Sequence, residues 1–296
     1  MISFIKMNGA GNDFVIFDAR TQPVTLSSDQ LRQIADRNNA VTQGCDQIIV
    51  MEHSKKADVF MRIYNADGSE VDACGNATRC IAELMEKELH RLPVSIETNA
   101  AILKGIKKAV RDNKEYMLVD MGKPRLDWKD IPLKHPLEKS AALVKEKSGL
   151  SADPMFVNMG NPHVVFFSSF EPDSNISSPP SHVIATEFTR MSHALEHSKD
   201  IFPDGVNVSV VSLNASGTDM YALHALVWER GVGLTKACGT AACAMLVAAN
   251  RRNAKIRNAV VWFEDSLNFV STAINENAHV LLGGPVEIEF SGEMAL

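Results

Sequence analysis

The chain of 296 residues has an average globular composition, with 45% hydrophobic and 22% charged residues and a formal net charge of −6. A chain of this length can bury a large core and is long enough for two domains. The composition excludes disordered, collagen-like and coiled-coil proteins. The acidic balance without a basic stripe argues against nucleic-acid binding. Without an apolar run of about 18 residues or a secretory signal pattern, we predict a cytoplasmic protein that does not bind membranes.

The cysteines predict neither a disulfide framework nor a metal site. Their number is odd, and none of them form a CxxC pair or a zinc-type cluster with histidine. The five cysteines are Cys45, Cys74, Cys80, Cys238 and Cys243. In a reducing compartment, thiols with a function are usually catalytic or bound to a metal.

Short runs rich in β-branched and aromatic residues, separated by Gly, Asn and Pro, predict strands. In chain order, the predicted strands are 14–18, 47–51, 58–65, 115–122, 155–160, 163–167, 206–214, 219–229, 259–264 and 286–290. The predicted helices are 27–37, 76–91, 186–198 and 240–252. Ser27 and Thr186 suit the N-caps of the first and third, and Gln30 completes a capping box with Ser27. The Ser- and Pro-rich stretch 168–182 is predicted to be a surface loop.

The two halves of the chain resemble each other in four places that follow in the same order. The matched pairs are Gly11-Asn12 with Gly160-Asn161, Gln47 with Asn207, Tyr64-Asn65 with Trp228-Glu229, and Ala73-Cys74-Gly75 with Ala237-Cys238-Gly239. Such an ordered set predicts a duplicated domain. We expect halves at 1–120 and 121–285, with a C-terminal strand at 286–296 returning to the first. Each half should wrap its strands around one central helix.

Each central helix is predicted to begin directly after a cysteine, with the two cysteines facing each other. The residues that follow Cys74 and Cys238 are small, so the backbone N–H groups of the first turn stay accessible. The helix dipole should lower the pKa of a thiol there, and a carboxylate can bind the same N–H groups. Two such ends would give a base and an acid for moving the α-proton of an amino acid. A single cysteine of this kind is more often a buried small hydrophobe.

Several longer stretches carry a family resemblance. They are KMNGAGNDFVIFD, GCDQ, RIYNADGSEVDACGNATRC, MGNPHVVF, GVNV and ERGVGLTKACGTAACA, running from residue 6 to residue 244. In these stretches the chain closely resembles the PLP-independent diaminopimelate epimerases. The resemblance implies an α/β fold of two pseudo-symmetric domains, each a mostly antiparallel, barrel-like sheet around a central helix. It also implies interconversion of LL- and meso-diaminopimelate, for lysine and peptidoglycan synthesis, without a cofactor or a metal.

The resemblance also implies roles for individual residues. Cys74 and Cys238 would be the acid/base thiols, and His163 and Glu229 would tune their ionisation. The carboxylate at the reacting carbon would be held by Gly75, Asn76, Gly239 and Thr240. The neutral polar residues lining the site would be Asn12, Gln47, Asn65, Asn161 and Asn207. Glu229 and Arg230 would bind the substrate ammonium and a carboxylate. The expected partners are this small molecule and a second copy of the chain in a homodimer.

Two departures from the family pattern and three alternative functions stay open at this stage. Ala77 and Ala241 stand where many members have Gly, which would matter if a left-handed backbone were needed there. A proline or hydroxyproline racemase would use the same two thiols, but Arg230 and the asparagines suit a second amino-acid head. A phenazine-synthesis-like isomerase would lack the thiol pair. A non-catalytic binding protein would tolerate serine at both cysteine positions.

Overall fold

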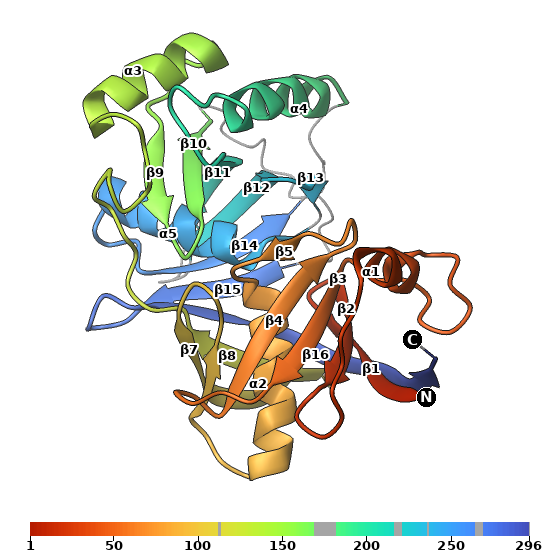
Figure 1. Ribbon diagram of the computed structural model, residues 1–296. Helices are drawn as coiled ribbons and strands as arrows, with labels where there is room; N and C mark the ends of the chain where they lie inside the picture. The colour runs from red at the N-terminus through yellow and green to blue at the C-terminus, as the bar shows by residue number, and fades with distance from the viewer. Residues whose placement is uncertain (112–113, 169–181, 216–220, 236, 264–268, 296) are drawn as a thin grey trace. The chain divides into compact units, whose positions relative to one another are not determined.

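The computed structural model describes residues 1–111, 114–168, 182–215, 221–235, 237–263 and 269–295 (Figure 1). The chain forms two compact units, Met1–Met121 with Gly283–Leu296, and Gly122–Leu282. Strand β16 (Val280–Met294) therefore begins in the second unit and ends in the first. In the described part of the chain, no helix has the length and apolar character needed to cross a membrane.

The first unit is a closed barrel around one helix. Its strands follow the order β1-β2-β3-β4-β6-β7-β8-β16, and β16 pairs again with β1. The pairs β2–β3 and β4–β6 are parallel, whereas β1–β2, β3–β4, β6–β7, β7–β8 and β1–β16 are antiparallel. Helix α2 packs against β1, β4, β6, β7 and β8 (Figure 1). The elements are β1 (Ile2–Gly9), β2 (Asn12–Asp18), α1 (Ser28–Ala35), β3 (Gln47–Glu52), β4 (Val59–Asn65), β5 (Glu70–Val71), α2 (Gly75–Leu89), β6 (Val94–Glu97), β7 (Ile102–Arg111) and β8 (Lys114–Asp120).

The second unit arranges its strands around α5 in the order β16-β15-β14-β12-β11-β10-β9. Its parallel pairs are β10–β11 and β12–β14, and β9–β10, β11–β12 and β14–β15 are antiparallel. Helices α3 and α4 lie together beside β9 to β12 and cover a cluster of buried apolar side chains (Figure 1). The elements are α3 (Leu137–Ser148), β9 (Met155–Asn158), β10 (Pro162–Phe167), α4 (His182–Glu196), β11 (Asn207–Ala215), β12 (Tyr221–Glu229), β13 (Gly233–Thr235), α5 (Gly239–Arg252), β14 (Asn258–Phe263) and β15 (Phe269–Ile274).

The two units share one topology, which confirms the predicted pseudo-symmetric fold. In each, an antiparallel hairpin is followed by a helix, a parallel strand, an antiparallel strand, a short hairpin strand and the central helix. The register agrees as well. Gln47 of β3 pairs with Phe14 of β2, and Asn207 of β11 pairs with His163 of β10. Since Phe14 and His163 each lie two residues after the matched asparagines, the sequence repeat is also a structural repeat.

The helix signals that the sequence carries are found in the structure, with one shift. Ser27 caps α1 in a complete capping box with Gln30, as predicted. The third predicted helix begins earlier than expected, at His182, so Thr186 lies inside α4 and is not its N-cap. Most of the predicted loop, residues 169–181, lies outside the described residues. Cys80 and Cys243 are fully buried within α2 and α5, where they pack as small apolar side chains.

The sequence pattern does not predict several strands and one helix that the structure contains. These elements are β1, β5, β6, β7, β13, β15 and α3. β7 (ILKGIKKAVR) alternates poorly because of its lysines and Gly105. β16 is longer than the predicted 286–290 because its pairing continues through Gly283, Gly284 and Pro285, which are poor strand formers.

Gly105 of β7 is a point of close packing against α2. A Cβ atom there would lie 2.6 Å from the Cβ of Ala82 on α2 and 3.0 Å from Cγ2 of Val94 on β6. We expect Gly105→Ala to lower the free energy of unfolding of the first unit by about 1–3 kcal/mol through overpacking. Urea unfolding followed by circular dichroism measures this change. Lys104→Ala, at an exposed neighbour on the same strand, is the control and should change it by less than about 0.5 kcal/mol.

Candidate functional site

Both central helices begin at a cysteine N-cap with extended backbone. Cys74 has φ −146° and ψ 112°, and Cys238 has φ −134° and ψ 114°. The sulfur of Cys74 accepts a hydrogen bond from the backbone N–H of Ala77 at 3.5 Å. Ala77 and Ala241 lie within the helices and outside the left-handed region, so their positions do not require glycine. The first-turn N–H groups, which have no partner within the helix, are therefore kept in both units.

The hairpin turn before each matched asparagine contains a glycine with positive φ. Gly11 has φ 86° and Gly160 has φ 104°, values that glycine adopts readily. The N–H of Gly11 donates to Oδ1 of Asn8, and that of Gly160 donates to Oδ1 of Asn158. The two turns place Asn12 at the start of β2 and Asn161 directly before β10.

In the first unit, the structure brings the predicted polar residues together in two groups. Oδ1 of Asn12 lies 3.8 Å from Sγ of Cys74 and accepts from Nδ2 of Asn76 at 3.4 Å. Separately, Nε2 of Gln47 donates to Oδ1 of Asn65 at 3.0 Å. Within the described residues, Oδ1 of Asn76 and Oε1 of Gln47 are buried without a hydrogen-bond partner. Buried acceptors of this kind require an explanation, and a ligand with N–H donors would satisfy them.

In the second unit, four predicted residues lie close together. Nε2 of His163 lies 2.8 Å from Oδ1 of Asn161, and because an amide oxygen only accepts, Nε2 carries the proton. Nδ2 of Asn207 lies 3.4 Å from the same nitrogen, but this is a contact between two donors and not a hydrogen bond. Oδ1 of Asn207 accepts from the backbone N–H of Arg230 at 2.7 Å, and the guanidinium of Arg230 donates to the carbonyl oxygen of Asp204 at 2.8 Å. These residues lie at the starts of β10 and β11 and directly after the end of β12.

His163 is a buried, neutral ring. Burial together with the positive charge of Arg230 lowers its pKa to about 3, so at neutral pH the ring is uncharged. It therefore offers no positive charge to a thiolate, and it lies within hydrogen-bond distance of the side chain of Asn161.

The prediction that the helix start lowers the thiol pKa is wrong for Cys238. Burial raises the pKa of this thiol well above its usual value, and the negative charge of Glu229 adds to the increase. The hydroxyl of Thr240, 3.4 Å from the sulfur, and the N–H of Ala241 act in the opposite direction but are outweighed. Glu229 is itself held by the hydroxyl of Thr235 at 2.6 Å. In this state Cys238 is a protonated thiol.

Comparison with known proteins agrees with this arrangement. The diaminopimelate epimerase family profile matches residues 4–126 and 155–293. A relative from Phenylobacterium zucineum named diaminopimelate epimerase is 40% identical over 293 residues, which cover 98% of this chain and 97% of that protein. The chain belongs to the diaminopimelate epimerase family. In this family context, the residues at each helix start are candidate active-site residues.

Solved structures share the fold with this member of the epimerase family. A predicted epimerase from Pseudomonas aeruginosa aligns with a TM-score of 0.65 at 14% identity, covering all of both chains. A hydroxyproline epimerase from Agrobacterium vitis aligns with a TM-score of 0.59 at 12% identity, covering 98% of this chain and 91% of that one. At such identities the likeness shows the fold alone, so it does not distinguish among the substrates of these enzymes.

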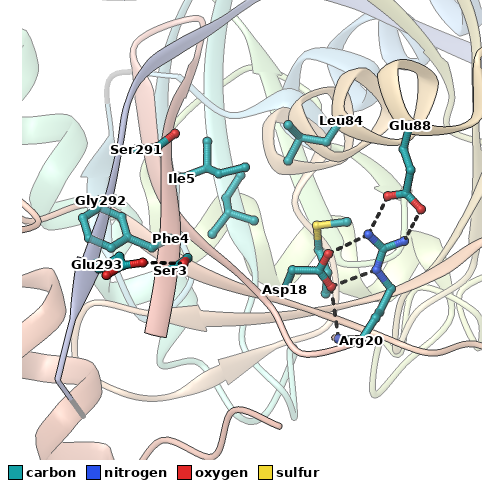
Figure 2. A pocket seen from close by; sticks show the side chains of 12 residues that line it. Ser3, Phe4, Ile5, Asp18, Arg20, Leu84, Glu88, Ser291, Gly292 and Glu293 are labelled. Atoms are coloured by element: carbon teal, nitrogen blue, oxygen red, sulfur yellow. Dashed lines mark hydrogen bonds and ion pairs between the residues drawn. The ribbon is translucent and has the colours of Figure 1, made fainter. Parts of the chain in front are cut away.

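A pocket of about 610 Å³ in the first unit of this epimerase-family chain contains none of the predicted site residues (Figure 2). Its walls include Ile5 and Leu84, and Arg20 lies at one side. Arg20 is engaged by Asp18 at 2.7 Å and by Glu88 at 2.6 Å. Because this cation is already neutralised, the pocket offers no ready anion site. Among the described residues, no group of three or more His, Cys, Asp or Glu side chains could hold a metal ion.

Two carboxylates that support the candidate site are absent from the sequence-based predictions. Asp46, directly before Gln47, accepts from Nδ2 of Asn12 at 2.9 Å. Glu196 at the end of α4 accepts from the indole N–H of Trp228 at 2.6 Å and from the N–H of Gly231 at 2.7 Å. Asp46 belongs to the GCDQ stretch, which is a signal in the sequence. Nothing local marks Glu196, whose partners lie more than thirty residues away.

The low pKa of His163 predicts a pH-dependent stability. An unfolded histidine binds a proton with a pKa near 6.5, whereas folded His163 stays neutral down to about 3. Its contribution is therefore present above pH 6.5 and is lost as the pH falls below that value. Between pH 7 and pH 5, the parent protein should lose about 2 kcal/mol more unfolding free energy than His163→Gln. Denaturant titrations at both pH values measure the difference, and parallel losses would contradict a neutral buried ring.

Proposed function

We propose that this chain epimerises LL-2,6-diaminopimelate to meso-diaminopimelate, using Cys74 and Cys238 as two acid/base groups and no organic cofactor. The observation that carries the proposal is the repetition of a cysteine N-cap at equivalent helices of two units with one topology, in a member of this family. The reaction would supply lysine and peptidoglycan synthesis.

The proposed reaction exchanges one proton for another at a single carbon. One thiolate removes the α-proton and becomes a thiol, and the electron pair left on the carbon is delocalised into the adjacent carboxylate. The N–H groups at the two helix starts, of Gly75, Asn76, Gly239 and Thr240, would stabilise that charge. The other thiol then donates its proton to the opposite face of the carbon and becomes a thiolate. The mechanism requires both sulfurs to reach the same carbon.

The ionisation of Cys238 suits the role of proton donor. Its raised pKa means that it holds its proton before substrate binds. The two thiols would exchange roles between the forward and the reverse reaction. A substrate ammonium near Glu229 would offset the negative charge that adds to the raised pKa of Cys238. The thiol and the thiolate of Cys238 would then lie closer in free energy.

The second amino-acid head of the substrate needs its own partners. Arg230 would offer two parallel N–H donors to the distal carboxylate, a geometry that lysine cannot reproduce. The unsatisfied oxygens of Asn76 and Gln47 would accept from an ammonium group. Neutral amides suit a substrate with two zwitterionic heads, because they orient it without adding fixed charge. A cytoplasmic location and a homodimeric assembly remain predictions from the sequence.

Removal of either thiol should abolish turnover. We expect Cys74→Ala and Cys238→Ala to lower kcat by about 10²- to 10⁴-fold or more, since each deletes a general acid or base. The assay follows the α-proton signal of LL-diaminopimelate by NMR in deuterium oxide, without added cofactor. Circular dichroism of each variant reports whether it folds.

The matched controls are Cys80→Ala and Cys243→Ala, at the buried cysteines of the same two helices, which should keep their turnover. Near-parental turnover in Cys74→Ala or Cys238→Ala would contradict the two-base proposal. Ligand binding without turnover in the parent, retained with serine at both positions, would favour a binding protein instead.

Arg230→Lys should not be a conservative change. It keeps the charge but loses the planar pair of donors, so kcat/KM for LL-diaminopimelate should fall by about one to two decades. Steady-state kinetics of both proteins measure the change. The parent should also turn over lysine and proline poorly, because these lack the second carboxylate. Proline turnover as fast as that of diaminopimelate would overturn the distal-site assignment in favour of a proline racemase.

A further inference from the structure

The side-chain amide of Asn12 is held at both ends. Its Nδ2 donates to Oδ2 of Asp46 at 2.9 Å, and its Oδ1 accepts from Nδ2 of Asn76 at 3.4 Å. The same Oδ1 lies 3.8 Å from Sγ of Cys74. An asparagine amide can be turned by 180° with little change in shape, so its partners decide which end faces the thiol.

Asp46 is bound in a way that leaves only the accepting role to its carboxylate. Oδ2 also accepts from the backbone N–H of Asp13 at 3.1 Å, and Oδ1 accepts from the guanidinium of Arg37 at 2.6 Å. Asp13 is in turn bound by Arg37 and by Lys6, each at 2.6 Å. Although burial opposes ionisation of Asp13, these hydrogen bonds hold its pKa well below the usual range. The cluster thus pairs two carboxylates with two cations.

The contacts of Asp46 fix the direction of the amides beyond it. Burial and the neighbouring charge of Asp13 raise the pKa of Asp46, but its carboxylate oxygens accept from three N–H groups. Asn12 therefore turns its NH₂ group toward Asp46 and its oxygen toward Cys74. That oxygen attracts the NH₂ group of Asn76, whose own oxygen is then left buried and without a partner among the described residues. The carboxylate of Asp46 therefore determines which end of each amide, in Asn12 and in Asn76, faces its neighbour.

We propose that Asp46 is a positioning residue that sets the polarity of the Asn12 and Asn76 amides, so that one oxygen accepts from the Cys74 thiol and the other from an ammonium group of the bound substrate. The catalytic meaning of this inference rests on the proposed function. The S–H group of Cys74 would then have an acceptor in Asn12 and a donor to its sulfur in the N–H of Ala77. Such a pair of contacts suits a group that must both hold and release a proton.

The second unit orients its matching asparagine in the opposite sense. There the donor Nε2–H of His163 engages Oδ1 of Asn161, which leaves the NH₂ group of Asn161 for other partners. A carboxylate at Asn12 and a neutral imidazole at Asn161 thus break the symmetry of the repeat.

The test measures the pH midpoint of Cys74 alkylation by iodoacetamide, read by peptide mass spectrometry in the full-length protein. Loss of the acceptor at the thiol favours the thiolate, so Asp46→Asn and Asn12→Ala should each lower the midpoint by about one pH unit. Arg37→Gln, which removes an outer partner of Asp46 and leaves its contact with Asn12, is the control. Its midpoint should not fall.

A double variant separates amide polarity from the simple loss of a negative charge. If Asp46 acts through Asn12, Asp46→Asn should cause no further shift in the Asn12→Ala background. A shift of the same size in both backgrounds would show a direct charge effect and overturn the proposal. If Asp46→Asn does not fold, Asp46→Ala replaces it in the cycle. If neither folds, Asn12→Ala decides alone, because an unchanged midpoint there would also overturn the proposal.

The alkylation readout does not depend on turnover, so the two proposals fail separately. A parent protein that leaves diaminopimelate unchanged would refute the proposed function, whereas the midpoints would still test the orientation of Asn12. A parent that epimerises diaminopimelate, with a midpoint that Asp46→Asn does not move, would refute only the role of Asp46.

Discussion

The unpaired backbone N–H groups at the starts of two helices are the feature on which the candidate site depends. A helix leaves its first N–H groups without internal partners, and the small residues after Cys74 and Cys238 keep them accessible. Around each of these ends the strands supply polar side chains at corresponding register positions. In each unit, the strands therefore surround the start of the central helix and line the approach to its N–H groups.

The two units share a topology but differ in the charged groups around their matched site residues. The first surrounds its asparagine with ionised groups, Asp46 and Asp13, balanced by Lys6 and Arg37. The second uses a buried histidine that stays neutral, and its thiol is kept protonated by burial and by Glu229. Two units with one topology but different charges suit a reaction that needs an acid and a base at the same time. If the two units were identical, both thiols would favour the same protonation state.

The repeat in the sequence was sufficient to predict the shared topology and the cysteine N-caps, because both depend on local patterns that recur along the chain. The ionisation of Cys238 was not predictable in this way, since it depends on burial and on Glu229, which only the folded chain brings near. The same holds for Glu196, which fixes the turn after Arg230 across a long separation in sequence. β7 escaped prediction, and β16 was predicted only over 286–290, because lysines and glycines interrupt their apolar alternation.

The path of β16 has a consequence for how the protein is made. The first unit contains both ends of the chain, since β1 pairs with the last residues of β16, Ile2 with Met294 and Phe4 with Gly292. During synthesis, β1 is translated before the whole second unit, whereas the part of β16 that pairs with β1 is translated after it. The strands of the second unit that precede β16 are therefore available before β1 has this partner. The barrel of the first unit can close only after the second unit has been translated.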